Sequence, residues 1–304
     1  MIGAGGIDVG GTKIEARLFD GEMAEIARHR VPVPRGDYAG IVDAVVTMSG
    51  WLRDRGGADL PVGVGLPGVI DPATGHATTA NLPATGRAIT AEIAARAGGG
   101  RIVFANDCKL FTLSEALGGA AEGAATVFGL VIGTGVGGGV VHRGQLVTGR
   151  GGLPGEVGHF GLPAHLDLPV LPCGCGARGC YETLLSGEGI ARLAAYLTGQ
   201  PVPAAQVFAR AAAGDAAMAG VADQWFALLT ELLLVLNLTI DPDVVVIGGG
   251  VSAVPGLADR AQALIDARVL RGTRAPHIRI ARFGDASGAR GAALFAARQD
   301  KEPT

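Results

Sequence analysis

Two glycine-rich turns between apolar segments constrain the fold of this chain more than any other feature. The first is Asp8-Val9-Gly10-Gly11-Thr12-Lys13, and the second covers residues 133–139 as GTGVGGG. Apolar residues alternate again after each turn, which predicts strand–turn–strand hairpins. Glycine in such turns costs conformational entropy unless the backbone must approach another group closely. Backbone N–H groups that reach phosphate oxygens would account for both turns, and a plain hairpin remains the alternative for the first.

Strands and helices alternate throughout the first ~117 residues, which is typical of an α/β fold. We predict a hairpin over Ile2–Phe19, strands at Val62–Leu66, Arg101–Ala105, Thr126–Ile132, Val140–His142 and Val244–Ile247, and helices at Asp37–Arg55, Thr90–Ala97, Cys108–Leu117 and Gly288–Arg298. Residues 187–238 are predicted to be mainly helical, and residues 149–180 irregular. Because the strand–glycine turn–strand pattern occurs twice, the sequence predicts two related halves.

A third glycine run, Gly248-Gly249-Gly250, follows the strand predicted at Val244–Ile247. The GxGxxG spacing near residue 133 does not indicate a dinucleotide site, because a strand and not a helix follows it. Three glycine turns at strand ends favour one shared nucleotide, with Mg²⁺ held by Asp8. The residues predicted to bind the nucleotide and its Mg²⁺ are Asp8, Gly10, Gly11, Thr12, Lys13, Gly133, Thr134, Gly135, Gly137, Gly138, Gly248, Gly249 and Gly250.

An Asn-Asp pair lies directly after the strand predicted at Arg101–Ala105. Phosphoryl transfer to a hydroxyl group needs a base that accepts the hydroxyl proton during attack. Asp107 is suited to that role at a strand end, and Asn106 to binding a hydroxyl group. The alternative is that Asp107 only caps the helix predicted at Cys108–Leu117.

Four side chains that commonly bind metals are close in sequence: His159, Cys173, Cys175 and Cys180. One imidazole and three thiolates form a closed tetrahedral set, which predicts a structural Zn²⁺ site. Reduced or disulfide-bonded cysteines are the alternative. Glu156 and Glu182 flank the cluster, and together with His159 they can bind several hydroxyl groups of a sugar. Two surface glutamates are the simpler alternative.

The overall charge argues against nucleic acid as a partner. The net charge is −3 and no basic stripe occurs, so nucleic acid is not an expected partner.

The N-terminus lacks the features of a signal peptide. The apolar segment Phe226–Ile240 is too short and too interrupted for a membrane span and predicts a buried helix. We therefore expect a cytoplasmic protein.

These motifs, in this order, resemble the ROK family of sugar kinases and sugar-responsive repressors. The similarity extends over nearly the whole chain. The matching segments are DVGGTK at 8–13, LPG at 66–68, ND at 106–107, IGTGVGGG at 132–139, GEVGH at 155–159, CGCGARGC at 173–180 with Glu182, and DPDVVVIGGG at 241–250. The resemblance implies an α/β, actin-like ATPase fold of two RNase H-like lobes, with ATP and sugar in the cleft between them.

The resemblance also implies roles for particular residues. Asp107 is the base, and His159, Cys173, Cys175 and Cys180 bind zinc. The sugar-binding residues are Gly68, Asn81, Asn106, Asp107, Glu156, His159 and Glu182, with Gly68 and Asn81 near the 2-substituent. The small lobe comprises residues 1–117 and a C-terminal helix at about 285–304, and the large lobe comprises residues 118–284. The family further suggests a homodimer.

Three segments are most similar to the family members that phosphorylate N-acetylglucosamine on its 6-hydroxyl: residues 80–83, residues 133–140 and residues 283–293. Fructokinase, mannokinase and glucokinase members share much of this pattern and are the alternatives. A catalytically inactive sugar sensor or a repressor is more remote. Repressors of the family carry a helix-turn-helix before the first strand, and here that strand begins near residue 6.

Overall fold

The chain forms two compact units in a computed structural model that describes residues 2–79 and 82–299. Unit 1 contains the residues up to 118, residues 144–154 and the residues from 285 onward; unit 2 contains residues 119–143 and 155–284. The segment 144–154 differs from the sequence-based boundary, which placed it in the large lobe. It joins unit 1 because Lys109 Nζ donates hydrogen bonds to the carbonyl oxygens of Thr148 (3.4 Å) and Gly152 (2.7 Å).

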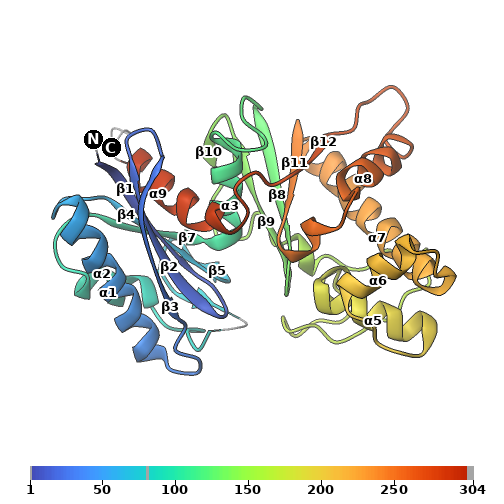
Figure 1. The fold of residues 1–304 in the computed structure, drawn as a ribbon, viewed down its shortest axis with the longest axis horizontal. Coiled ribbons are helices and arrows are strands. Elements are labelled where there is room, and N and C mark those ends of the chain that lie inside the picture. The colour runs from blue at the N-terminus through green and yellow to red at the C-terminus, as the bar shows by residue number, and fades with distance from the viewer. Residues whose placement is uncertain (1, 80–81, 300–304) are drawn as a thin grey trace. The chain divides into compact units, whose positions relative to one another are not determined.

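Unit 1 is built on a five-stranded sheet of order β3-β2-β1-β4-β7 (Figure 1). β2 is antiparallel to its two neighbours β1 and β3, whereas β4 and β7 continue parallel to β1. The strands are β1 (Ile2–Val9), β2 (Lys13–Asp20), β3 (Glu25–Pro32), β4 (Val62–Leu66) and β7 (Ile102–Asn106), with a small ladder of β5 (Val69–Ile70) and β6 (Ala77–Thr78). The helices are α1 (Tyr38–Gly56), α2 (Ile89–Arg96), α3 (Asp107–Ala116) and α9 (Ser287–Gln299).

Helices α1 and α9 cover opposite faces of this sheet, and two neighbouring glycines of β1 show it. A Cβ on Gly5 would lie 2.8 Å from the Leu52 side chain of α1, whereas a Cβ on Gly6 would lie 1.8 Å from the Ala289 carbonyl oxygen of α9. Successive strand residues face opposite sides of a sheet, so the two helices lie on different sides. Gly6 therefore lets the α9 backbone rest directly on the strand.

Unit 2 repeats the sheet of unit 1. Within unit 2 the strand order is β9-β8-β11-β12, with β8 antiparallel to β9 and parallel to β11, and β11 parallel to β12. The strands are β8 (Thr126–Ile132), β9 (Val136–His142), β11 (Val244–Gly248) and β12 (His277–Ile280), whereas β10 (Gln145–Leu146) belongs to the segment 144–154 of unit 1. The helices are α4 (Glu182–Leu185), α5 (Gly187–Thr198), α6 (Ala204–Ala212), α7 (Ala216–Ile240) and α8 (Leu257–Asp266), with 3-10 turns η1 (Val157–His159) and η2 (Gly250–Ala253). The 3-10 turn η3 (Gly284–Ala286) begins at the last residue of unit 2 and continues into unit 1.

The repeated sheet gives the fold class. A glycine-turned antiparallel hairpin followed by two parallel strands occurs in both units, as the echoed sequence motif predicted. This is the RNase H-like arrangement, and two copies of it make the actin-like ATPase fold. The fold class expected from the sequence is therefore confirmed.

Helix α7 forms the centre of the unit 2 core. Trp225, Leu229, Leu232 and Leu236 are fully buried along it. Among the described residues it is the one helix with the length and apolarity of a membrane span, yet 61% of its most apolar window is buried inside the protein. The buried helix predicted over Phe226–Ile240 is confirmed, and its burial is that of a core helix.

Two sequence-based boundaries need correction. The second glycine loop ends at Gly135, not at Gly139, because β9 begins at Val136 and residues 137–139 pair with β8. Helix α3 begins at Asp107, and its N-cap is Asn106, whose side chain accepts a hydrogen bond from the Lys109 N–H. The alternative interpretation, in which Asp107 is the helix cap, is therefore wrong. Asp107 occupies the first helical position.

Candidate active site

The first glycine turn closes the hairpin between β1 and β2. The Gly10 N–H donates to the Lys13 carbonyl oxygen at 2.9 Å, which fixes the turn. No atom lies within 4 Å of the position that a Cβ on Gly11 would occupy, so another group can approach the backbone there. The open backbone at Gly11 can therefore accommodate a phosphate group.

Asp8, at the end of β1, has an electrostatic environment that favours a cation. Burial, followed by the negative charges of Asp107 and Glu15, raises the pKa of the Asp8 carboxyl to about 7. A Cβ on Gly288 would lie 2.7 Å from the Asp8 carboxylate, so the glycine makes room for it at the start of α9. Asp8 therefore offers a carboxylate to a cation in a negatively charged environment, and Mg²⁺ prefers such oxygen ligands.

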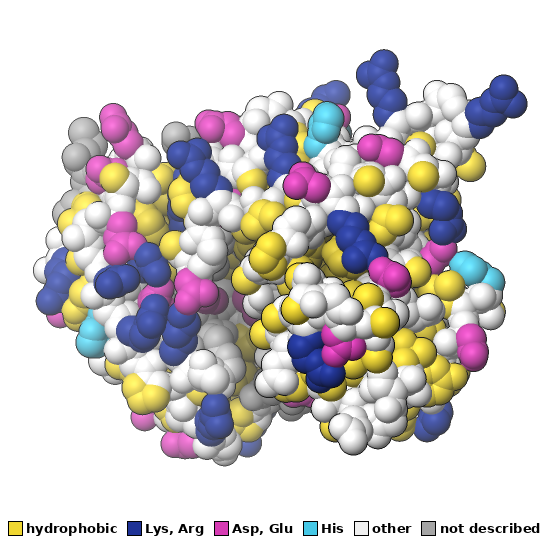
Figure 2. Space-filling view, turned by 45° about the vertical axis from the view of Figure 1, so that its right-hand side comes forward, with side chains coloured by type: hydrophobic (Ala, Val, Ile, Leu, Met, Phe, Trp, Pro, Cys, Tyr) yellow, Lys and Arg dark blue, Asp and Glu magenta, His cyan; other side chains and the backbone are white. Residues whose placement is uncertain are grey.

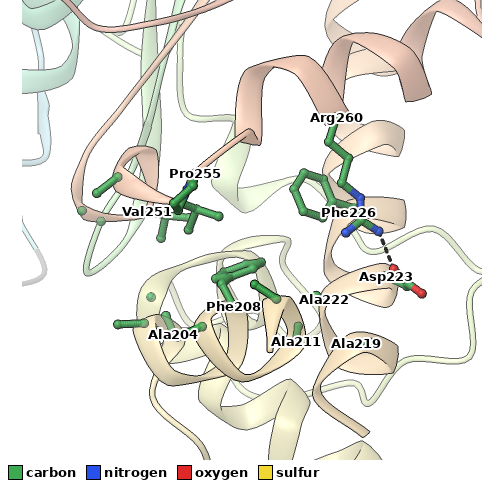
Figure 3. Close-up of a pocket in the computed structure, with 18 of the residues that line it drawn as sticks. Ala204, Phe208, Ala211, Ala219, Ala222, Asp223, Phe226, Val251, Pro255 and Arg260 are labelled. Atoms are coloured by element: carbon green, nitrogen blue, oxygen red, sulfur yellow. Dashed lines mark hydrogen bonds and ion pairs between the residues drawn. The ribbon is translucent and has the colours of Figure 1, made fainter. Parts of the chain in front are cut away.

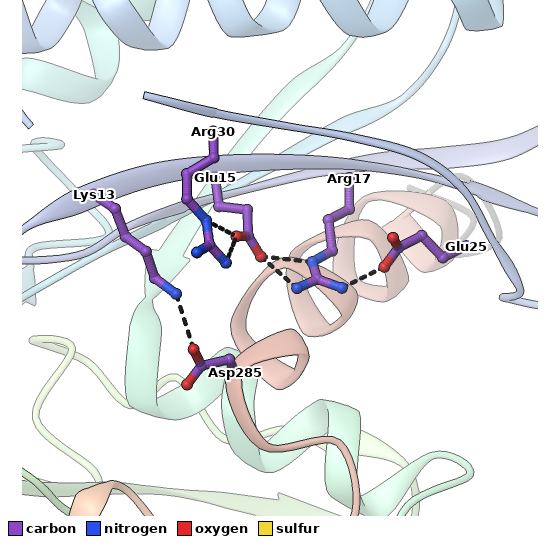
Figure 4. Close-up of polar contacts among 6 residues, drawn as sticks. All are labelled: Lys13, Glu15, Arg17, Glu25, Arg30 and Asp285. Carbon is purple, nitrogen blue, oxygen red and sulfur yellow. Dashed lines mark hydrogen bonds and ion pairs between the residues drawn. The ribbon is translucent and has the colours of Figure 1, made fainter. Parts of the chain in front are cut away.

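Charged side chains on β2 and β3 form an ion-pair network beside the turn (Figure 4). Glu15 is only 2% exposed and accepts hydrogen bonds from Arg17 Nε at 2.7 Å and from Arg30 Nε at 2.5 Å. Arg17 also pairs with Glu25. Lys13 Nζ lies 3.0 Å from Asp285 Oδ2. The pairs of Glu15 with Arg17 and Arg30 join β2 to β3, and Lys13, at the end of the turn, pairs separately with Asp285 of η3.

The Asn-Asp pair joins the end of β7 to the start of α3. Asn106 is 6% exposed, and its Nδ2 donates to the Gly68 carbonyl oxygen at 2.9 Å. Its Oδ1 accepts a hydrogen bond from the Lys109 N–H. Because Nδ2 carries two hydrogens and the bond to Gly68 uses one, the other can serve a ligand. Asp107 Oδ1 accepts a hydrogen bond from the Cys108 N–H at 2.8 Å. The positive end of α3 thus orients the Asp107 carboxylate.

Gly68 requires glycine for two reasons. Its φ is +92°, and a Cβ would lie 2.3 Å from the Thr78 carbonyl oxygen. The Asn106 side chain therefore holds a backbone carbonyl whose geometry other residues cannot adopt. Asn81, the other residue predicted near the sugar 2-substituent, lies outside the described residues.

The second glycine turn, residues 133–135, has a different environment at each glycine. A Cβ on Gly133 would meet no atom within 4 Å, whereas a Cβ on Gly135 would lie 2.6 Å from Glu182 Oε2. A Cβ on Gly138, in the strand that follows, would lie 2.4 Å from the Gly129 carbonyl oxygen. The space at Gly133 is thus open to a ligand, and the other two glycines accommodate neighbouring protein groups.

A large pocket of about 940 Å³ opens beside this turn within unit 2 (Figure 3). Gly133, Thr134 and Gly250 line one part of it, and alanines of α6 and α7 line much of the rest. Phe226 forms an apolar wall, with the Arg260 guanidinium 4.1 Å above its ring. Arg260 in turn pairs with Asp223. The size and the apolar lining suit the nucleoside part of a nucleotide, and the glycine backbone is available for the phosphates.

Most of the residues that line this pocket were not predicted from the sequence. Gly249 does not line it; its φ is +81°, and a Cβ there would lie 2.4 Å from the Ile132 carbonyl oxygen. The signal that was available is the alanine-rich run over residues 204–222, where small side chains leave space between α6 and α7.

The predicted metal ligands come together in unit 2. Cys175 and Cys180 have Sγ atoms 3.7 Å apart, and Cys173 Sγ lies 3.7 Å from His159 Nδ1. All four ligand atoms lie within 4.8 Å of one another. A tetrahedral Zn²⁺ with bonds of ~2.3 Å separates two sulfurs by ~3.8 Å. A disulfide needs ~2.05 Å, so the spacing fits the metal and excludes the bond.

The residues that flank the cluster contact it. His159 Nε2 lies 3.8 Å from Glu156 Oε2, on the ring nitrogen that faces away from the cysteines. Glu182 Oε1 lies 3.8 Å from Cys173 Sγ, and its Oε2 accepts a hydrogen bond from the Val136 N–H at 2.9 Å. Burial raises the pKa of the Cys180 thiol to about 12, so a thiolate at neutral pH requires a bound cation.

Charges on the molecular surface are mixed in sign. On the face shown in Figure 2, Lys and Arg side chains lie among Asp and Glu side chains. This distribution agrees with the small net charge of −3.

The fold and these sites are those of a nucleotide-dependent phosphotransferase, and the chain belongs to the ROK family, whose model matches residues 4–299. It is 37% identical over 296 residues to the N-acetyl-D-glucosamine kinase of Yersinia pseudotuberculosis serotype O:1b, covering 95% of this chain and 97% of the relative. It is 35% identical over 294 residues to an N-acetylgalactosamine kinase of a Shewanella species, covering 95% of both chains. The crystal structure of a ROK hexokinase from Thermus thermophilus superposes with a TM-score of 0.87 at 32% identity, covering all of both chains.

Proposed function

We propose that this protein is an ATP-dependent kinase that phosphorylates N-acetylglucosamine on its 6-hydroxyl, giving N-acetylglucosamine 6-phosphate and ADP. The proposal is carried by the 35–37% identity to kinases of N-acetylhexosamines over 95% of the chain, which also has Asp107 at the start of α3. The enzyme is proposed to act in the cytoplasm, where ATP is available, and to be a homodimer.

Asp107 is the proposed base. The sugar 6-hydroxyl transfers its proton to the Asp107 carboxylate while its oxygen forms a bond to the γ-phosphorus, and the bond from that phosphorus to the bridging oxygen of ADP breaks. The Cys108 N–H holds Asp107 Oδ1, which orients the carboxylate before the sugar arrives. Most of the rate enhancement then comes from positioning and charge stabilisation, as is general for phosphoryl transfer.

The proposed sugar ligands besides Asp107 are Gly68, Asn81, Asn106, Glu156, His159 and Glu182. Zinc is proposed to bind His159 through Nδ1, which leaves Nε2 available to a sugar hydroxyl beside Glu156. Zn²⁺ when bound would staple the irregular segment between His159 and Cys180. The zinc is structural in this proposal, because its four ligands are all protein side chains.

ATP is proposed to lie with its base in the unit 2 pocket and its phosphates at the glycine turns. Support comes from the open space at Gly133, Gly250 and Gly11. Mg²⁺ when bound would neutralise phosphate charge, and Asp8 is its proposed protein ligand. Lys13 would contribute a further positive charge once it leaves Asp285.

Filling the pocket should weaken ATP binding selectively. Ala219 of α7 lines the pocket, and a leucine there occupies space that the base needs. We expect Ala219→Leu to raise the KM for ATP about tenfold, with the KM for sugar little changed. Ala217→Leu, at an exposed position of the same helix, is the matched control. Steady-state rates at varied ATP concentration check this, and equal KM values for the two variants would contradict the assignment of the pocket.

The raised pKa of Asp8 predicts opposite effects of pH on stability and on Mg²⁺ binding. Its folded pKa of about 7 exceeds the ordinary value of 3.8, so its contribution to stability is complete below about pH 4 and is lost as pH rises through 7. Asp8→Asn should therefore raise the Tm by about 3 °C or more at pH 8.5 without Mg²⁺, and by about half as much at pH 5.5.

Because Mg²⁺ binds the ionised carboxylate, Mg-nucleotide affinity of the wild-type protein should fall as pH drops below about 7. Thermal unfolding at both pH values and calorimetric titration check the two effects. A Tm difference that is the same at pH 5.5 and pH 8.5 would show that Asp8 does not titrate in this range.

An ADP-release assay with Mg-ATP tests the function directly. The sugars to compare are N-acetylglucosamine, N-acetylgalactosamine, N-acetylmannosamine, glucose, mannose and fructose. We expect the highest kcat/KM with N-acetylglucosamine. A preference for glucose, mannose or fructose would keep the kinase mechanism and replace the substrate. Turnover of none of the six would favour the catalytically inactive sugar sensor.

A further inference from the structure

Glu182 contacts two sites that are separate in the sequence. It is the first residue of α4 and follows the last cysteine of the metal cluster by two positions. One carboxylate oxygen, Oε2, accepts a hydrogen bond from the Val136 N–H at the end of the second glycine turn, at 2.9 Å. The other, Oε1, lies 3.8 Å from Cys173 Sγ in the metal cluster. A single half-buried side chain therefore bridges the two.

The glycine turn is shaped around this carboxylate. A Cβ on Gly135 would lie 2.6 Å from Glu182 Oε2, so a side chain there would displace the carboxylate. The turn is held a second time by the same segment, because the Gly187 N–H at the start of α5 donates to the Gly133 carbonyl oxygen at 2.8 Å. Residues 182–187 thus hold both ends of the turn.

The turn borders the pocket. Gly133 and Thr134 of the turn and Gly187 of α5 all line it. A hydrogen bond between a backbone N–H and a carboxylate is charge-assisted and stronger than a neutral one. By fixing Val136, Glu182 orders the turn before a nucleotide arrives, which reduces the conformational entropy lost on binding.

We propose that Glu182 is a positioning residue for the nucleotide site, and that zinc, by ordering the segment that leads into α4, and the sugar both raise nucleotide affinity through it. This inference rests on the proposed function, in which the turn binds ATP phosphates and the cluster binds Zn²⁺. A carboxylate has about four acceptor positions, so Glu182 can accept a sugar hydroxyl while it holds Val136. Because coupling between binding sites is reciprocal, nucleotide must raise sugar affinity by the same factor.

The test measures nucleotide affinity without sugar, a quantity that a pure sugar ligand would not affect. Calorimetric Kd values for a non-hydrolysable ATP analogue with Mg²⁺ are compared in the zinc-loaded wild-type protein, Glu182→Gln, Glu182→Ala and Glu156→Gln. We expect Glu182→Ala to raise the Kd about tenfold or more, since it removes a hydrogen bond to a charged acceptor. Glu182→Gln should lie between it and wild type, because its amide oxygen still accepts from Val136.

Glu156→Gln is the matched control, because Glu156 lies beside His159 and is a proposed sugar ligand. It should weaken sugar binding and leave the nucleotide Kd unchanged. Chelation of zinc should raise the nucleotide Kd of the wild-type protein, and should have a smaller effect in Glu182→Ala, where the bridge is already lost.

An unchanged nucleotide Kd in Glu182→Ala, with sugar affinity reduced, would overturn the inference and make Glu182 a sugar ligand only. An equal loss of nucleotide affinity in Glu156→Gln would also overturn it. Failure of the wild-type protein to bind nucleotide at all would instead refute the proposed function, and the inference with it.

Discussion

Asp107→Asn should lower kcat by about 10²–10⁴, because a carboxamide cannot accept the hydroxyl proton during attack. The substitution keeps the shape of the side chain, and the asparagine Oδ1 can still accept the Cys108 N–H that now orients Asp107. The cap of α3 is supplied by Asn106 and is unaffected. Sugar affinity should therefore change little. Steady-state kinetics together with calorimetric sugar binding separate the two quantities.

Asp59→Asn, on an exposed loop of the same unit, controls for the loss of one carboxylate. It should retain wild-type kcat. The Tm of Asp107→Asn should remain close to that of the wild-type protein, so a low rate cannot be attributed to unfolding. A kcat for Asp107→Asn within a few-fold of wild type would falsify its assignment as the base.

Loss of zinc is expected to have the second largest effect, on stability and sugar affinity together. The purified protein should contain one zinc per chain by elemental analysis. Chelation, or Cys180→Ser, should lower the Tm by about 5–10 °C, because the segment between His159 and Cys180 has little regular structure to hold it otherwise. Sugar affinity should fall as well, since His159 and Glu182 contact the cluster.

Cys108→Ser is the matched control, because Cys108 lies outside the cluster. It should keep its zinc. Active protein that contains no zinc, or a chelated protein with an unchanged Tm, would refute the structural role of the metal.

Most of the fold could be predicted because its signals are local. The hairpin at Ile2–Phe19 and the strands Val62–Leu66 and Thr126–Ile132 follow from alternation and from glycine at the turns. Strand β3 was not predicted, since its exposed sequence EIARHRVP has little apolar alternation and is a strand because it pairs with β2. Helix α8 and strand β12 were likewise missed.

The candidate site was predicted less evenly, because a glycine does not indicate what it makes room for. Gly133 leaves space for a ligand, whereas Gly135 leaves space for Glu182 and Gly138 for β8. All three look alike in sequence. The pocket in unit 2 exists because small side chains in α6 and α7 leave space, and an alanine-rich run by itself does not indicate a binding site. The metal cluster was predictable because one histidine and three closely spaced cysteines supply a complete tetrahedral ligand set within a single segment of the chain.

The placement of α9 has a consequence for how unit 1 folds. The carbonyl oxygens of Ala289 and Ala292 would lie within 2 Å of a Cβ on Gly6 and on Gly63 respectively, so α9 covers strands that are far from it in the sequence. The stretch 155–284 of unit 2 lies between these strands and α9 along the chain. Because contacts between segments so distant in sequence form slowly, we expect α9 to cover this face of the first sheet late in the folding of unit 1.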